Sequence, residues 1–221
     1  MSATPIGTTF MTEQHLRAAP PHGPRHGIAT RIVHMALAGG VIVQLSTSAI
    51  MDAPQPGRPD DIFFTAHSYA GLVTMAAALA FWIVVMARRR GTDAADLIPW
   101  VSRGRRADVA ADLGRHWRAI RSGAVPEYEE WSPLASAIHG LGLLLMTTMA
   151  GLGTVWFLAG VFGVGAAPWV GLVRETHGLA GNLVYAYLIG HAGLGLLHHL
   201  RGQASLAGMW SLNRRPTPRP D

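Results

Sequence analysis

Apolar residues in this chain are grouped into four long blocks instead of recurring at the period of a surface helix or strand. The blocks cover residues 32–51, 63–87, 133–164 and 176–200. Each reaches the roughly 20 residues that a helix needs to cross about 30 Å of hydrocarbon. Open backbone groups have no partner in lipid, so each block is expected to be a helix. The third block is too long for one span, and we expect it to end in a loop.

Arginine is concentrated on one side of these blocks. All 18 basic residues are Arg, and nine of them lie in residues 88–131, whereas the other two connections hold few. More follow in the two terminal flanks: Arg17, Arg25, Arg31, Arg201, Arg214, Arg215 and Arg219. By the positive-inside rule, both termini and residues 88–131 are expected in the cytoplasm. The predicted fold is an all-α, integral membrane four-helix bundle.

The remaining segments are polar. Residues 1–27 are rich in Pro and Gly, lack the apolar core of a secretory signal and are predicted to be a flexible tail. The transmembrane domain is predicted to span residues 28–201, and residues 202–221 to form a cytoplasmic tail. Within the 88–131 loop, Val109, Leu113, Trp117 and Ile120 recur at helical spacing among Arg residues. This pattern predicts a basic amphipathic helix that lies on the inner leaflet or docks a cytoplasmic partner.

Composition narrows the classes of function. Only 14% of the 221 residues are charged, and the net charge of +5 follows from the Arg residues at the ends of the blocks, so it does not indicate nucleic-acid binding. The chain has no Cys, which excludes disulfides, iron–sulfur ligation and covalent c-type haem attachment on it.

Histidine is the candidate functional residue. Six of eleven lie within or at the ends of the blocks: His34, His67, His139, His177, His191 and His198, with His199 beside the last. Ionisable groups in a bilayer are costly and indicate function. One such His could simply hydrogen-bond another helix, but six in four helices favour a binding role.

The depths of these histidines predict two pairs. His177 and His191 are 14 residues apart, which places them about 21 Å apart along one helix and within about 40° of the same direction. His34 lies at the inner level and His67 at the outer one. We therefore expect the pairs His34/His191 and His67/His177, with His139 and His198 as neighbours. At the inner surface, His198 is a rival ligand or a residue that handles quinone or protons.

Two bis-His pairs without Cys suit haem iron better than zinc or copper, because each pair comes from different helices. A zinc or proton transporter would need carboxylates beside the His, and the blocks contain essentially none. Gly71, Gly181 and Gly195 each follow a paired His by four residues and could make room for a porphyrin, or could simply pack helices. Candidate propionate partners are Arg31 inside and Arg58 or Arg174 outside.

These motifs resemble the bacterial cytochrome b561 family, in a wider group with the b-type (gamma) subunits of formate dehydrogenases and nickel–iron hydrogenases. The resemblance is carried by Arg31–His34, by His67–Gly71 and by the run from His177 through His191 to His198 and His199, and covers roughly residues 25–212. It implies that His34, His67, His177 and His191 ligate two b-type haems. The long 88–131 loop is more similar to the gamma-subunit branch.

The expected function is electron transfer between the quinone pool and a redox partner, as the membrane subunit of a respiratory complex in the bacterial inner membrane. One alternative is a stand-alone quinone oxidoreductase similar to the superoxide-oxidising b561 proteins. Another is a non-redox scaffold or transporter.

Overall fold

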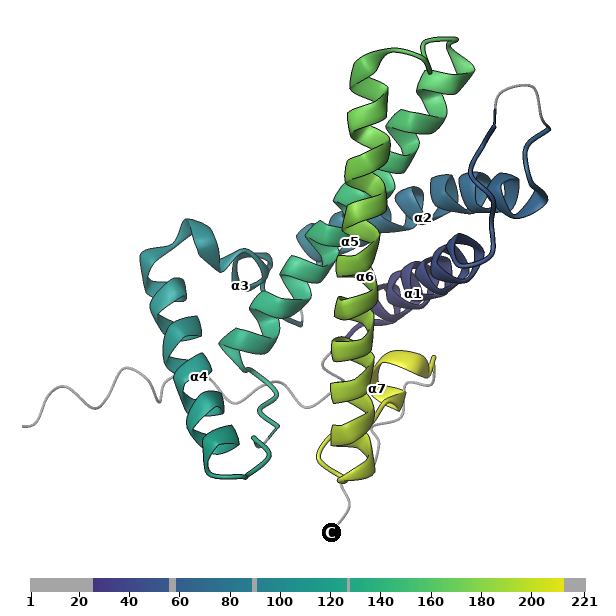
Figure 1. The fold of residues 1–221 in the computed structure, drawn as a ribbon. Coiled ribbons are helices and arrows are strands. Elements are labelled where there is room, and N and C mark those ends of the chain that lie inside the picture. Colours follow the sequence, from purple (N-terminus) through teal and green to yellow (C-terminus); the bar gives the residue numbers. More distant parts are fainter. Residues whose placement is uncertain (1–25, 56–58, 89–90, 127, 213–221) are drawn as a thin grey trace, which may run out of the picture.

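Four long helices make up most of the part of the chain that the computed structural model describes, which is residues 26–55, 59–88, 91–126 and 128–212 (Figure 1). They are α1 (Ile28–Ser48), α2 (Ile62–Ala87), α5 (Pro133–Val161) and α6 (Pro168–Leu200). Each is long and apolar enough to cross a membrane, so the predicted helical membrane bundle is confirmed. Shorter elements follow α2 and α6: α3 (Ala94–Leu97), η1 (Pro99–Val101), α4 (Arg103–Arg121) and α7 (Ala207–Trp210).

The helix boundaries follow from local capping. The Asp61 carboxylate accepts the N–H groups of Phe63 and Phe64 at the start of α2, and the Ser132 hydroxyl accepts that of Ala135 at the start of α5. Helix α6 begins at Pro168, eight residues before the predicted start. Proline is preorganised for the first helical position, and the charged Arg174 and Glu175 that interrupted the apolar pattern are accommodated within the helix.

Packing runs from α1 to α2, from α2 to α5 and from α5 to α6. The buried core is small and lies between these helices: Leu37, Val41, Ala78, Val85, Leu143, Met146 and Val184, with Leu97 from α3. Most other apolar side chains of the four helices are exposed. A large exposed apolar surface is a liability in water but is the surface that a lipid-facing helix needs.

Polar contacts hold neighbouring helices in register. Gln44 on α1 donates to the carbonyl of His67 on α2 at 2.8 Å, and the Trp82 indole on α2 donates to Thr147 on α5 at 3.0 Å. A Cβ on Gly40 would lie 2.5 Å from the Thr74 hydroxyl, so α1 and α2 approach closely there. Polar contacts of this kind commonly link helices inside membranes.

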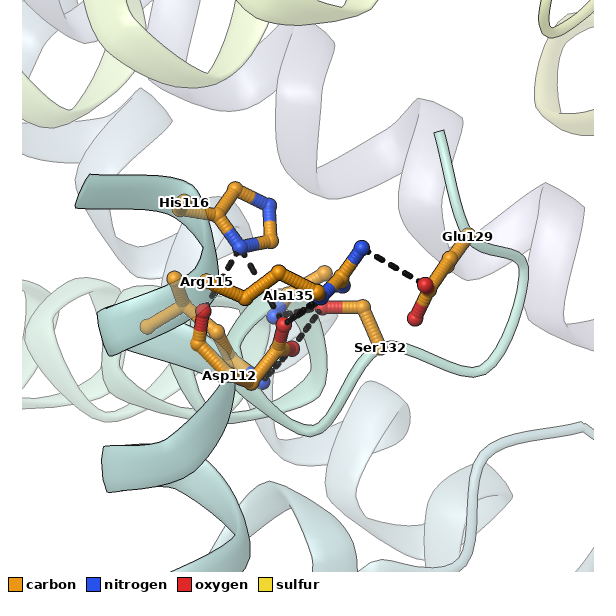
Figure 2. A network of polar contacts seen from close by, with 7 residues as sticks. Asp112, Arg115, His116, Glu129, Ser132 and Ala135 are labelled. Carbon is orange, nitrogen blue, oxygen red and sulfur yellow. Dashed lines mark hydrogen bonds and ion pairs between the residues drawn. The ribbon is translucent and has the colours of Figure 1, made fainter. Parts of the chain in front are cut away.

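Residues between α2 and α5 are anchored to the start of α5 at two points, and α3 and α4 lie to one side of the long helices (Figure 1). At the first point, the Leu97 carbonyl touches Gly140, where a Cβ would come within 1.7 Å. The second is a buried carboxylate, Asp112 of α4, which accepts from the Ser132 hydroxyl at 2.6 Å and from the Leu134 N–H at 3.1 Å (Figure 2).

Asp112 is the centre of a wider polar network (Figure 2). The Arg115 guanidinium donates to it at 2.5 Å and also bridges to Glu129 at 2.6 Å. Burial by itself raises the pKa of the Asp112 carboxyl, but the hydrogen bonds from Ser132, Leu134 and Arg115 outweigh that effect and leave the pKa below its ordinary value. The folded chain therefore favours a charged Asp112.

The chain after α6 turns back towards α1. Helix α7 packs against α1, and the buried Arg31 donates to the Ser211 carbonyl at 2.8 Å and the His26 carbonyl at 3.1 Å. The part of the predicted tail that is described thus belongs to the packed structure. Arg31 also fixes the two ends of the described chain at one level of the bundle.

We predict that Gly140→Ala lowers the stability of the fold, because the Leu97 carbonyl is backbone and cannot move without displacing α3. Overpacking of this kind costs about 1–3 kcal/mol. Thermal unfolding of the detergent-solubilised protein, followed by circular dichroism, should show a lower Tm. Gly151→Ala on the same helix is the control, since nothing lies within 4 Å of its added Cβ. Equal Tm values for the two variants would refute this role of Gly140.

Candidate functional site

Two pairs of histidines meet between the long helices. His67 of α2 and His177 of α6 have ring centroids 6.1 Å apart with planes at 89°. His34 of α1 and His191 of α6 have centroids 6.3 Å apart with planes at 56°. These are the pairs that the sequence predicts, and α6 contributes one member to each.

The centroid separations match the geometry of a shared iron. An imidazole nitrogen binds a first-row metal at about 2.0–2.1 Å and lies about 1.1 Å from its ring centroid, so two rings on opposite sides of one iron have centroids roughly 6.3 Å apart. Rings in direct van der Waals contact could approach more closely, as His139 and His191 do at 5.2 Å. The centroid separations of both predicted pairs are compatible with one metal atom between the two rings.

Hydrogen bonding sets the orientation of the His67 ring. Its Nδ1 lies 3.0 Å from the Thr47 hydroxyl oxygen. That hydroxyl has one proton, which it donates within α1 to the carbonyl of Val43 at 2.8 Å or of Gln44 at 3.1 Å. With that proton bonded inside α1, Thr47 accepts from His67, and the ring then has its proton on Nδ1 and a free lone pair on Nε2 that could bind a metal.

His177 is oriented in the same way by α5. Its Nδ1 lies 3.1 Å from the Met149 carbonyl, which can only accept. The ring therefore also presents a basic Nε2. Gly153 makes this approach possible, because a Cβ there would lie 3.0 Å from the His177 ring. A ligand His that donates its second ring nitrogen to a carbonyl or hydroxyl is the usual arrangement in metal sites.

Aromatic rings surround the inner pair. Trp210 of α7 and Phe81 of α2 meet the His34 ring edge-on, with centroids 5.7 and 6.4 Å away. Tyr187 stacks on His191 with planes 8° apart and centroids 5.4 Å apart. Gly142 of α5 makes room for Tyr187, since a Cβ there would lie 2.0 Å from its hydroxyl. Among the described residues, the buried Nδ1 of His34 makes no hydrogen bond, so no such bond orients this ring.

Two cavities adjoin the outer pair, of about 540 and 290 Å³, and both are lined by His67, His177, Gly71 and Gln44. The larger extends towards Phe64 and Trp156, and the smaller towards α1 and Gly181. Gly71 and Gly181 are two of the glycines that the sequence placed four residues after a histidine. A flat group centred between His67 and His177 would extend into these two cavities.

The remaining histidines occupy other positions. His139 contacts the His191 ring but is too close for an iron midway between them. His198 Nδ1 bonds the Gln203 amide oxygen at 2.8 Å, and its ring lies 5.4 Å from that of Tyr128. His199 contacts the Ala204 carbonyl at 3.3 Å. Of the predicted propionate partners, Arg174 is exposed, Arg31 bonds backbone carbonyls, and Arg58 lies outside the described residues.

Sequence patterns did not identify Thr47, Tyr187 or Trp210 as parts of the site. Tyr187 lies one turn before His191 on the same helix face, which is a signal that helical spacing could have provided. Thr47 and Trp210 reach their histidines through packing of separate elements, so no local pattern in the sequence indicates them.

Four apolar helices and paired histidines are features of a membrane protein that binds haem. The family model described as prokaryotic cytochrome b561 matches residues 25–212. The chain belongs to this family, and so to the b-type haem proteins of electron transfer in bacterial membranes. No curated protein and no solved structure matches the chain.

We predict that Thr47→Val removes the hydrogen bond that orients the His67 ring, because a methyl group cannot bond to Nδ1. Loss of such a supporting partner commonly costs 10–100-fold in metal affinity or activity. If His67 is a haem ligand, haem retention during dilution in detergent and the haem midpoint potential should both change. Thr47→Ser retains the hydroxyl and is the control, for which we expect wild-type behaviour. If Val and Ser variants behave alike, the hydrogen bond has no role in ligation.

Proposed function

We propose that the chain binds two b-type haems and conducts electrons across the bacterial inner membrane, between the quinone pool and a redox partner protein. The axial ligands would be His34 with His191 for the inner haem, and His67 with His177 for the outer haem. The main support is that the structure brings the two rings of each pair together, at a centroid separation compatible with an iron atom between them.

The positions along α6 support conduction across the membrane. His177 and His191 are 14 residues apart on one continuous helix, or about 21 Å along its axis. One site thus lies towards each end of the bundle. When bound, each haem accepts and releases one electron at its iron. The chain would supply the ligands, orient the two outer rings through Thr47 and the Met149 carbonyl, and exclude water with apolar and aromatic side chains.

His198 supports a quinone site at the inner end. It lies at the end of α6, two turns beyond His191, with Gln203 and Tyr128 beside it. Imidazole, amide and phenol groups can donate and accept the hydrogen bonds and protons that a quinone head group exchanges on reduction. Cytoplasmic placement of this end follows from the arginine-rich flanks.

The segment between α2 and α5 supports a role as a subunit of a complex. Because it is anchored at Gly140 and at Ser132, it presents a fixed surface that includes the exposed Trp100 and Val101 of η1. Such a surface suits a catalytic partner subunit that exchanges electrons with the inner site.

We expect each of His34→Ala and His191→Ala to remove the inner haem only, and each of His67→Ala and His177→Ala the outer one. Haem per chain, measured by pyridine haemochrome, should fall by half in each variant, because one missing axial ligand leaves an iron without its bis-His site. His139→Ala is the control and should keep full haem. A ligand variant with undiminished haem would contradict the pairing.

We expect His198→Ala to slow electron exchange with a soluble quinol by at least about tenfold, as loss of a proton-transfer group does. Stopped-flow reduction of the haems by quinol measures this rate. Haem content should stay full, which separates the quinone role from ligation, and His199→Ala should react at the wild-type rate. An unchanged rate in His198→Ala with full haem would refute the assignment.

A further inference from the structure

Helix α4 packs against α5 with its polar side. Asp112, Arg115 and His116 lie on the side that meets Ser132 and Leu134, and they are joined there by hydrogen bonds and ion pairs (Figure 2). An amphipathic helix in a water-soluble protein does the reverse, because burial of its apolar side drives its packing. The apolar side of α4 is therefore left for something else to cover.

The apolar stripe of α4 is exposed. Leu113 is 54% exposed, Ile120 57% and Trp117 59%. At about 100° per residue, the stripe is centred about 100° around the helix from Asp112. The stripe is therefore neither at the contact with α5 nor on the side of α4 directly opposite that contact.

The depth of α4 identifies what lies beside it. Asp112, near the middle of α4, accepts the N–H of Leu134, which is in the first turn of α5. Helix α5 is one of the four membrane spans, so its first turn marks the level at which the chain enters the bilayer. The middle of α4 is therefore at the level of the lipid head groups, where Trp side chains are enriched.

Charge indicates the kind of lipid. The helix carries six Arg against Asp108 and Asp112. Arg103, Arg118 and Arg121 are exposed and lie on the side of the stripe away from Asp112. Guanidinium groups pair with phosphate, and basic residues favour an anionic leaflet.

We propose that α4 is a membrane-surface anchor, in which the stripe Leu113, Trp117 and Ile120 enters the acyl boundary of an anionic phospholipid leaflet while the neighbouring Arg side chains bind its phosphates. The Asp112 network then fixes this anchor to α5, and the lipid surface orients the whole segment between α2 and α5.

The absence of Cys from the chain allows a direct test. Leu113→Cys and Ala111→Cys each provide one site for a nitroxide label, and Ala111 is exposed about 160° from the stripe. The full chain with bound haem, reconstituted into vesicles of phosphatidylcholine and phosphatidylglycerol without any partner protein, is probed with lipid-soluble oxygen and a water-soluble nickel chelate. The haem spectrum of each labelled variant confirms that it is folded.

The ratio of oxygen to nickel accessibility should be at least about fivefold higher at position 113 than at position 111, as for a helix in the interface. Arg118→Gln combined with Arg121→Gln, or vesicles of phosphatidylcholine alone, should lower the ratio at position 113. Equal ratios at the two positions would overturn the anchor and leave the stripe as a surface for a protein. A ratio indifferent to both changes would overturn the role of anionic head groups.

Discussion

An imidazole inside a bilayer needs a partner, because neither water nor lipid tails can satisfy its nitrogens. In this bundle four such rings are arranged as two facing pairs, each with the separation that one iron would occupy. Their placement depends on one continuous helix, α6, which supplies a ring to each pair. Helices α1 and α2 supply the opposite rings, His34 and His67, and α5 supplies the Met149 carbonyl and the glycines that α6 packs against.

Glycine on α5 has three separate uses. Gly140 admits the backbone of α3, Gly142 admits Tyr187, and Gly153 admits His177. Each brings another element closer than any side chain would permit, and two of the three act directly on a proposed ligand or on the ring stacked against it. Close approach of this kind is a general means of helix association in membranes. Here the close approach at Gly142 and Gly153 also sets the positions of Tyr187 and His177.

The sequence predicted the four spans, the amphipathic helix and which histidines lie near each other, because apolar length and helical periodicity can be read along the chain. It placed the start of α6 too late, since Arg174 and Glu175 interrupt an apolar block without interrupting a helix. It could not predict that Thr47 hydrogen-bonds His67 or that the Trp210 ring contacts His34, since both contacts depend on how separate helices pack. Periodicity also could not show that α4 would meet α5 with its polar side.

Membership of the family establishes that the chain binds b-type haem but not how many haems it binds. Two haems could carry electrons across the bilayer, whereas a single haem would serve only one side. The most direct measurement is the haem stoichiometry of the wild-type chain, purified and quantified by pyridine haemochrome against protein determined by amino-acid analysis. Two b-type haems per chain, both low-spin, are what two bis-His sites require. One haem per chain, or none, would contradict the account.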